Sequence, residues 1–157
     1  MATRRIAASA VTSSVVAAGL LALAGCTGTH ISPLTPPPYR TEMPASYEVT
    51  WTATVKALAR QNIPLRAVAR DSGVIASDEF VTPIGVYADC GSLGSSRIEG
   101  EALVSYTLFA TPNGEGTRIQ INSKMRTFGH RKGVYQCVST LRFEANLADA
   151  IRELVRP

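Results

Sequence analysis

The chain has 157 residues, a formal net charge of +4 and 45% hydrophobic residues. This length suits one domain, and the composition is that of a globular protein. The charge is too small to indicate nucleic-acid binding, which needs a clustered basic surface.

The first 25 residues have the features of a secretory signal peptide. Arg4 and Arg5 precede an uncharged apolar stretch from Val15 to Ala24. A basic start, an apolar run of about ten residues and a small-residue cleavage site are typical of such a peptide. The run is too short for a transmembrane helix, which needs about 20 apolar residues. We therefore expect residues 1–25 to be removed, which leaves 14 basic and 12 acidic residues.

The motif Leu23-Ala24-Gly25-Cys26 resembles the lipobox of bacterial lipoproteins at every position. The resemblance implies that Cys26 receives a diacylglycerol, that cleavage precedes it, and that the new amine is acylated, commonly with palmitate. Two or more acyl chains hold a protein stably on a membrane without spanning it. The alternatives are an ordinary signal peptide and a buried apolar helix that ends in Cys. Since Thr27 and not Asp follows Cys26, the address resembles that of enteric outer-membrane lipoproteins on the periplasmic face.

Cys90 and Cys137 are the two cysteines that remain once Cys26 is lipidated. An exported protein meets an oxidising compartment, so an even pair predicts a disulfide. This bond would close a loop of about 48 residues and stabilise the fold by roughly 4 kcal/mol on the chain-entropy model. The alternatives are a metal site, for which the ligands are too few, and a catalytic pair of Cys137 with His130, which needs an unoxidised thiol. We expect no metal and no cofactor.

A tether and a helix follow the lipidation motif. Four prolines between Pro33 and Pro38 favour an extended segment, at about 3.1 Å per residue. Residues 26–44 are therefore predicted to tether a single domain, residues 45–157, above the bilayer. Apolar residues spaced by three and four, including Trp51, predict a helix from Tyr47 to Gln61 with Ser46 as its N-cap.

Four strands and a second helix are expected after this. Leu65–Arg70 and Val74–Phe80 predict a hairpin around Asp71-Ser72-Gly73, and residues 81–100 are irregular. Ala102–Thr111 and Thr117–Phe128 alternate like strands. An apolar stripe then predicts a helix from about Ser139 or Thr140 to Val155. The expected fold class is α+β: a four-stranded antiparallel sheet with the N- and C-terminal helices packed on one face.

The strand from Thr117 to Phe128 carries a polar stripe that faces away from its apolar side. It is the candidate interaction face, for an acidic partner or a lipid headgroup, and the basic loop at Arg131 and Lys132 could extend it. The alternative is an ordinary solvated face, since antiparallel sheets commonly have one wet side. The stripe consists of Arg118, Gln120, Asn122, Lys124 and Arg126.

Three features together resemble small lipoprotein domains with the helix-grip arrangement. They are Trp51 on a helix before the Asp71-Ser72-Gly73-Val74-Ile75 hairpin, the segment Tyr87-Ala88-Asp89-Cys90-Gly91, and a terminal helix after Cys137. The folded modules of the C-subunit lipoprotein of the outer-membrane β-barrel assembly machine have this shape, and the likeness covers Ser46 to Val155. That family brings no catalytic residues.

Common catalytic motifs are missing from the sequence: the Gly-x-Ser-x-Gly elbow, the His-Glu-x-x-His zinc motif and the phosphate loop. We therefore expect a lipid-anchored binding module of the cell envelope with no catalysis. Its expected partners are the membrane, through Cys26, and other envelope proteins. The alternative is a periplasmic carrier of a small apolar ligand, with a groove between helix and sheet lined by Trp51, Tyr106 and Phe128.

Overall fold

A long hairpin of two strands forms the centre of the fold. The computed structural model describes residues 29–129 and 133–156. Within them β9 (Glu101–Asn113) and β10 (Gly116–Phe128) pair antiparallel along almost their whole length. Buried and solvent-facing residues alternate along most of β9, as in a sheet with one covered face. Both strands were predicted from this alternation, and the prediction is confirmed.

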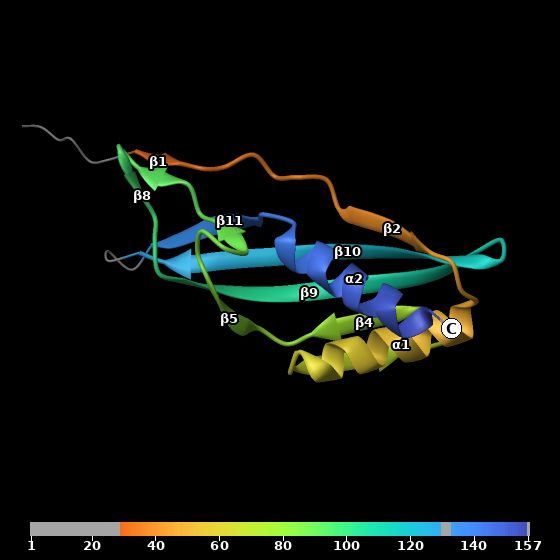
Figure 1. The fold of residues 1–157 in the computed structure, drawn as a ribbon. Helices are drawn as coiled ribbons and strands as arrows, with labels where there is room; N and C mark the ends of the chain where they lie inside the picture. The colour runs from red at the N-terminus through yellow and green to blue at the C-terminus, as the bar shows by residue number, and fades with distance from the viewer. Residues whose placement is uncertain (1–28, 130–132, 157) are drawn as a thin grey trace, which may run out of the picture.

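The sheet around this hairpin has eight strands, so the predicted count of four is wrong (Figure 1). Because β9 and β10 are each 13 residues long, two short strands fit one after the other along each outer edge. β4 and β5 share the edge of β9, and β2 and β11 share that of β10. The short strands are β2 (Tyr39–Met43), β3 (Leu65–Ala69), β4 (Val74–Ser77), β5 (Phe80–Pro83), β6 (Ala88–Asp89) and β11 (Val134–Ser139).

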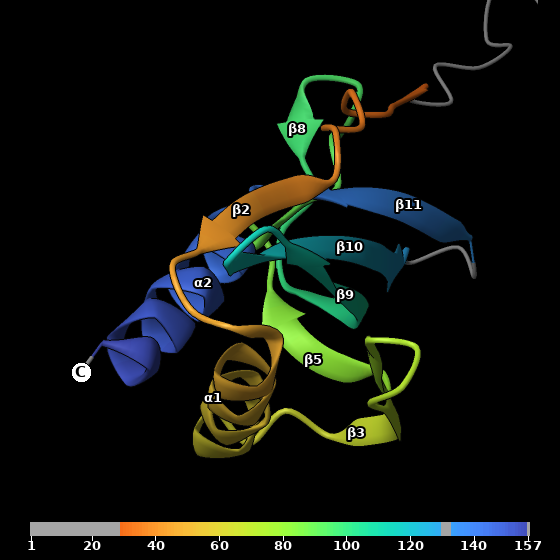
Figure 2. The ribbon, with the colours of Figure 1, turned by 90° about the vertical axis from the view of Figure 1, so that its right-hand side faces the viewer.

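The two helices, α1 (Tyr47–Arg60) and α2 (Arg142–Val155), lie on the same side of the curved sheet (Figure 2). Between helices and sheet, Trp51 and Tyr106 are buried, and the Tyr106 ring stacks on Phe143 of α2 with centroids 4.1 Å apart. Large side chains buried in this way each contribute about 1.5–3 kcal/mol. The α+β class with two helices is thus confirmed, and the opposite sheet face has neither helix over it.

The segment predicted as a tether packs against the domain over its described part. β1 (His30–Ile31) pairs with β7 (Ser92–Leu93), and β7 pairs with β8 (Ser96–Arg97) in a separate three-stranded sheet. β2 joins the main sheet a few residues later. Residues 29–43 therefore belong to the folded domain, which corrects the boundary predicted at residue 45.

The stretch predicted as irregular, residues 81–100, holds the end of β5 and all of β6, β7 and β8. The Cys90–Cys137 disulfide links the end of β6 to β11 and confirms the predicted pairing. Both cysteines are buried. The covalent bond and the β6–β11 pairing together fix a stretch with little periodicity of its own.

Candidate functional site

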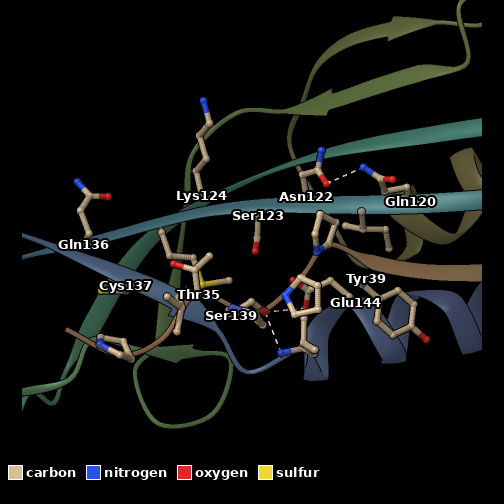
Figure 3. Close-up of a pocket in the computed structure, with 18 of the residues that line it drawn as sticks. Thr35, Tyr39, Gln120, Asn122, Ser123, Lys124, Gln136, Cys137, Ser139 and Glu144 are labelled. Atoms are coloured by element: carbon tan, nitrogen blue, oxygen red, sulfur yellow. Dashed lines mark hydrogen bonds between the residues drawn. The ribbon is translucent and has the colours of Figure 1, made fainter.

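β10 presents its polar stripe on the sheet face away from the helices. Lys124, Asn122 and Gln120 point to one side of the strand, and Ser123 points to the other (Figure 3). This alternation follows from the two-residue period of a strand. All five predicted residues of the stripe therefore share one face, and Arg118 and Lys124 are its exposed members.

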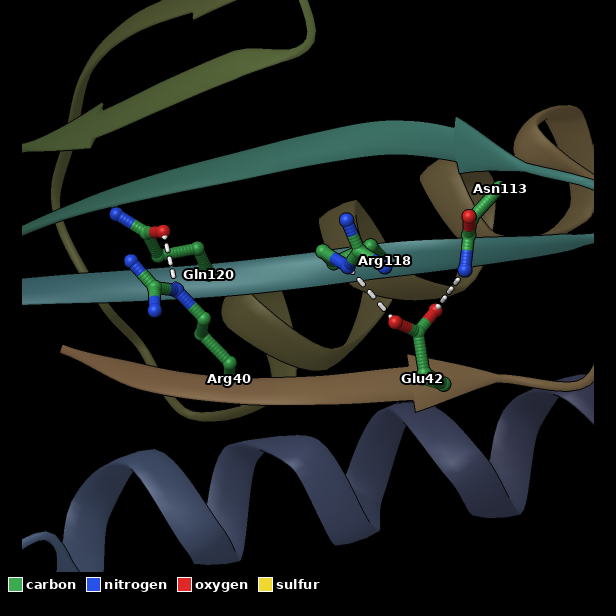
Figure 4. Close-up of polar contacts among 5 residues, drawn as sticks. All are labelled: Arg40, Glu42, Asn113, Arg118 and Gln120. Carbon is green, nitrogen blue, oxygen red and sulfur yellow. Dashed lines mark hydrogen bonds and ion pairs between the residues drawn. The ribbon is translucent and has the colours of Figure 1, made fainter.

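One end of the stripe is paired with β2, a strand that the sequence did not predict. The Arg118 Nε atom donates to Glu42 at 2.7 Å, and Asn113 donates to the other carboxylate oxygen at 3.0 Å (Figure 4). Arg40 donates to Gln120 at 2.8 Å. The bond from Arg118, followed by that from Asn113, lowers the pKa of Glu42, so this carboxylate stays charged and offsets part of the stripe's positive charge.

The other end is paired with Glu79, which lies between β4 and β5. Arg126 donates two hydrogen bonds to its carboxylate, at 3.1 and 2.7 Å, and the Arg126 side chain lies over the Phe128 ring, 5.4 Å from its centroid. The hydrogen bonds from Arg126 lower the pKa of Glu79 and raise that of the guanidinium. Two of the stripe's cations are therefore already neutralised by carboxylates of the same chain.

Lys124 differs from the two arginines. It is exposed, and within residues 29–129 and 133–156 it makes no ion pair. Its place opposite Ser105 in the register puts it near the middle of the sheet face. Of the three cations in the predicted polar stripe, Lys124 is thus the one without an ion pair among the described residues, and it lies between two internally paired arginines. The predicted extension at Arg131 and Lys132 lies outside the described residues.

A groove opens where the edge of β10 has no neighbouring strand. β2 pairs with β10 up to Ile121, and β11 pairs with it from Met125. Residues 122–124 lie between the two pairings, and the proline-rich segment passes beside them (Figure 3). The cavity volume is about 610 Å³. Its walls combine apolar groups, such as Ile121 and Met125, with hydroxyls and one carboxylate.

The carboxylate in this groove is Glu144, which is only 1% exposed. Ser139 donates its hydroxyl hydrogen to Glu144 at 2.8 Å and accepts the Leu141 N–H at 2.9 Å. Such bonds satisfy groups that the start of a helix leaves without partners. The helix was predicted to start at about Ser139 or Thr140; its N-cap position is instead Leu141, at a φ of 64°. The geometry gives Glu144 a structural role at the start of α2.

The predicted carrier groove is not formed by its three residues. Trp51 and Tyr106 are 6% and 5% exposed inside the core, whereas Phe128 is 59% exposed on the opposite sheet face. Burial, with a smaller effect from the negative charge of Glu144, raises the pKa of Tyr106. The phenol is therefore a neutral core group, and the interface between helices and sheet is filled by side chains.

The remaining predicted sites have different outcomes. Cys26 and His130 lie outside the described residues, so lipidation and the Cys–His pair stay predictions. Cys137 is bonded to Cys90. In the part of the chain that the structure describes, no group of three or more His, Cys, Asp or Glu side chains could hold a metal ion.

Sequence reasoning missed Arg40, Glu42 and Glu79, which decide the charge of the face. The stretch Tyr39-Arg40-Thr41-Glu42-Met43 does alternate between inward and outward residues, and this signal could have predicted β2. The four prolines that precede this stretch favoured a tether instead. Glu79 had no such signal, because its approach to Arg126 depends on the break between β4 and β5.

Comparisons with known proteins add little to this geometry. No family model matches the chain, and no curated protein matches it. Among solved structures, the fold is similar to a DUF4468 family protein from Bacteroides ovatus, with a TM-score of 0.39 and 16% sequence identity. The match covers 63% of this chain and 59% of that protein. A likeness of this degree carries no argument about function.

Proposed function

We propose that this protein is a lipid-anchored lipoprotein of the bacterial cell envelope, on the periplasmic face of the outer membrane, and that it acts as a binding module. The lipobox-like motif that ends at Cys26 supports the anchor. The Cys90–Cys137 disulfide supports an exported protein, because disulfides persist in oxidising compartments. In residues 29–129 and 133–156, no helix is long and apolar enough to cross a membrane. The module type belongs to the same proposal: a helix-grip-like domain comparable to those of the β-barrel assembly lipoprotein.

The open sheet face is the observation that carries the binding role. Both helices cover the other face, so among the described residues no second layer covers the face around Lys124 (Figure 2). Two ion pairs hold its arginines in place, and Lys124 lies between them without an ion pair in the part of the chain that the structure describes. An exposed cation without an ion pair favours a partner that brings a carboxylate to this point.

We assign the protein no catalytic role. In the described ranges, the two cysteines are bonded to each other. The buried carboxylate of Glu144 is taken up by Ser139 at the start of α2. These side chains have structural partners, and the proposed binding role requires no reaction from them.

The experiment that tests the binding role compares two charge reversals on opposite faces. Lys124→Glu should abolish cross-linking of the membrane-bound protein to its envelope partner, because it places a carboxylate where the partner's carboxylate would dock. Lys56→Glu is the matched control, since Lys56 is an exposed lysine on α1. Reversal of Arg126 is unsuitable because it would place a second carboxylate beside Glu79. If both variants cross-link as the wild type does, the open face is not the binding surface.

A small-ligand carrier is the second candidate, now at a different place from the one predicted. The groove beside residues 122–124 has a volume of about 610 Å³ and a partly apolar wall, which falls within the usual size of ligand pockets. A carrier should release an apolar compound on denaturation, visible by mass spectrometry. A protein-binding module should release none.

A further inference from the structure

The point where the chain enters the domain is fixed to one end of the sheet. Thr29 is the first described residue, and its carbonyl accepts the Gly94 N–H at 3.1 Å. The His30 ring lies 4.6 Å from the Tyr135 ring of β11, and its Nε2 atom is 3.1 Å from the Cys90 carbonyl oxygen. The entry point is therefore attached to β7, to the disulfide and to the start of β11.

The lipidation site cannot be far from this end. Cys26 precedes Thr29 by three residues. Consecutive Cα atoms are about 3.8 Å apart, so the two Cα atoms are separated by about 11 Å at most. The headgroup region of one leaflet is itself about 5–8 Å thick. A lipid on Cys26 would therefore hold this end of the domain against the bilayer surface.

Exposed apolar side chains lie at this end of the domain. Ile31 follows His30 directly, and Leu93 is the register partner of His30. Phe128 and Val134 are register partners across β10 and β11, directly beside the pair formed by Thr127 and Tyr135. Their exposed fractions are 59% for Ile31, 36% for Leu93, 59% for Phe128 and 49% for Val134. In Figure 1, β1, β8 and the C-terminal end of β10 lie at one end of the molecule, opposite the C-terminus.

We propose that this end, defined as Ile31, Leu93, Phe128 and Val134, docks into the bilayer that holds the anchor. The inference rests on the proposed lipidation of Cys26. Interfacial segments bury apolar side chains about 5–10 Å into the boundary between headgroups and acyl chains, and apolar side chains at the ends of four strands suit that depth. Docking fixes the orientation of the domain, with the long axis of β9 and β10 rising from the membrane and Lys124 held above it.

The test is fluorescence quenching of the lipidated, mature protein in phosphatidylcholine vesicles whose acyl chains are brominated near the headgroup. Phe128→Trp places an indole at the proposed contact. Val49→Trp is the matched control, because Val49 is 48% exposed in the first turn of α1, which begins at the opposite end of the molecule (Figure 1). The wild-type protein supplies the baseline, since Trp51 is buried in the core. Intact mass of each sample shows whether Cys26 carries lipid.

We expect the brominated lipid to reduce the added fluorescence of Phe128→Trp at least twofold and to leave that of Val49→Trp within a tenth of its value in ordinary vesicles. A lipidated sample in which both indoles behave alike would overturn the docking, and the anchor would stand. An unlipidated mass would overturn the proposed anchor and this inference together. The two failures are therefore distinguishable in one preparation.

Discussion

Replacing Gly91 by alanine should release the N-terminal segment from the domain. Gly91 has a φ of 75°, and a Cβ atom there would overlap the carbonyl oxygen of Ile31. The left-handed conformation costs an L-residue about 1–2 kcal/mol. The overlap adds to this cost, and because the atom it meets is backbone, it is relieved only if β1 moves away.

The contacts that hold β1 are few enough for this strain to break them. The Thr29–Gly94 and His30–Cys90 hydrogen bonds each contribute about 0.5–1.5 kcal/mol, and the contact of His30 with Tyr135 adds about 0.5–1.5 kcal/mol. Together these three contacts contribute about 1.5–4.5 kcal/mol, in addition to the β1–β7 pairing. Loss of 2 kcal/mol raises the population of the open form roughly 30-fold.

Amide hydrogen exchange followed by NMR measures this opening at one atom, the Gly94 N–H that donates to Thr29. In Gly91→Ala we expect it to exchange about 30-fold faster than in the wild type. Gly114→Ala is the control, because Gly114 has a similar φ of 61° and nothing within 4 Å of an added Cβ. That variant should carry a similar left-handed backbone cost without the overlap, and should leave Gly94 protected. Equal exchange rates at Gly94 in both variants would refute the docking of β1.

Three further outcomes are expected. Replacing Cys90 and Cys137 together by alanine should remove about 4 kcal/mol of stability on the chain-entropy model and lower Tm by roughly 10–15 °C; an unchanged melting curve would contradict this. Ser139→Ala leaves a buried carboxylate and a helix-start N–H without their partner, and should cost about 1–3 kcal/mol in urea unfolding. Arg126→Gln should return the pKa of Glu79 toward its ordinary value of 4.5 in a carbon-13 titration. Since the pKa of Glu79 is lowered in the wild type, its pairing stabilises the fold at neutral pH and is lost as the pH falls through that lowered pKa. A Glu79 titration that does not move would show that the pairing is absent in solution.

Periodicity predicted the elements that bury a regular face. β9 and β10 alternate over many residues, and α1 and α2 carry apolar stripes at helical spacing, so each was found within a few residues of its observed bounds. The helices pack on one side because both stripes must be covered by the same apolar sheet face. The disulfide was predicted from the number of cysteines and the oxidising compartment, without any knowledge of where the two residues lie in the fold.

Elements held by tertiary contacts could not be predicted in this way. β1, β6, β7 and β8 have two residues each, too few for any period. They form because the disulfide and the Gly91 turn bring their backbones together. The proline-rich segment looked like a spacer since its composition favours extended chain, and extended chain is also the conformation that lies along a sheet edge.

The carboxylate partners of the candidate face could not be predicted from the sequence. The sequence placed five polar residues on one strand face correctly, because that depends only on the two-residue period. Their partners Glu42 and Glu79 come from segments 76 and 47 residues away, and separation along the chain hides such pairs. Only the fold shows that Lys124 is the cation of the stripe without an ion pair among the described residues.

The anchor is the central claim, because both the envelope address and the bilayer docking depend on Cys26. The most direct measurement is the intact mass of the protein from a native membrane extract, with and without reductant. We expect a mass that lacks residues 1–25, is raised by acyl chains, and gains two hydrogens on reduction of the Cys90–Cys137 bond. A full-length, unmodified mass with unoxidised thiols would contradict the account.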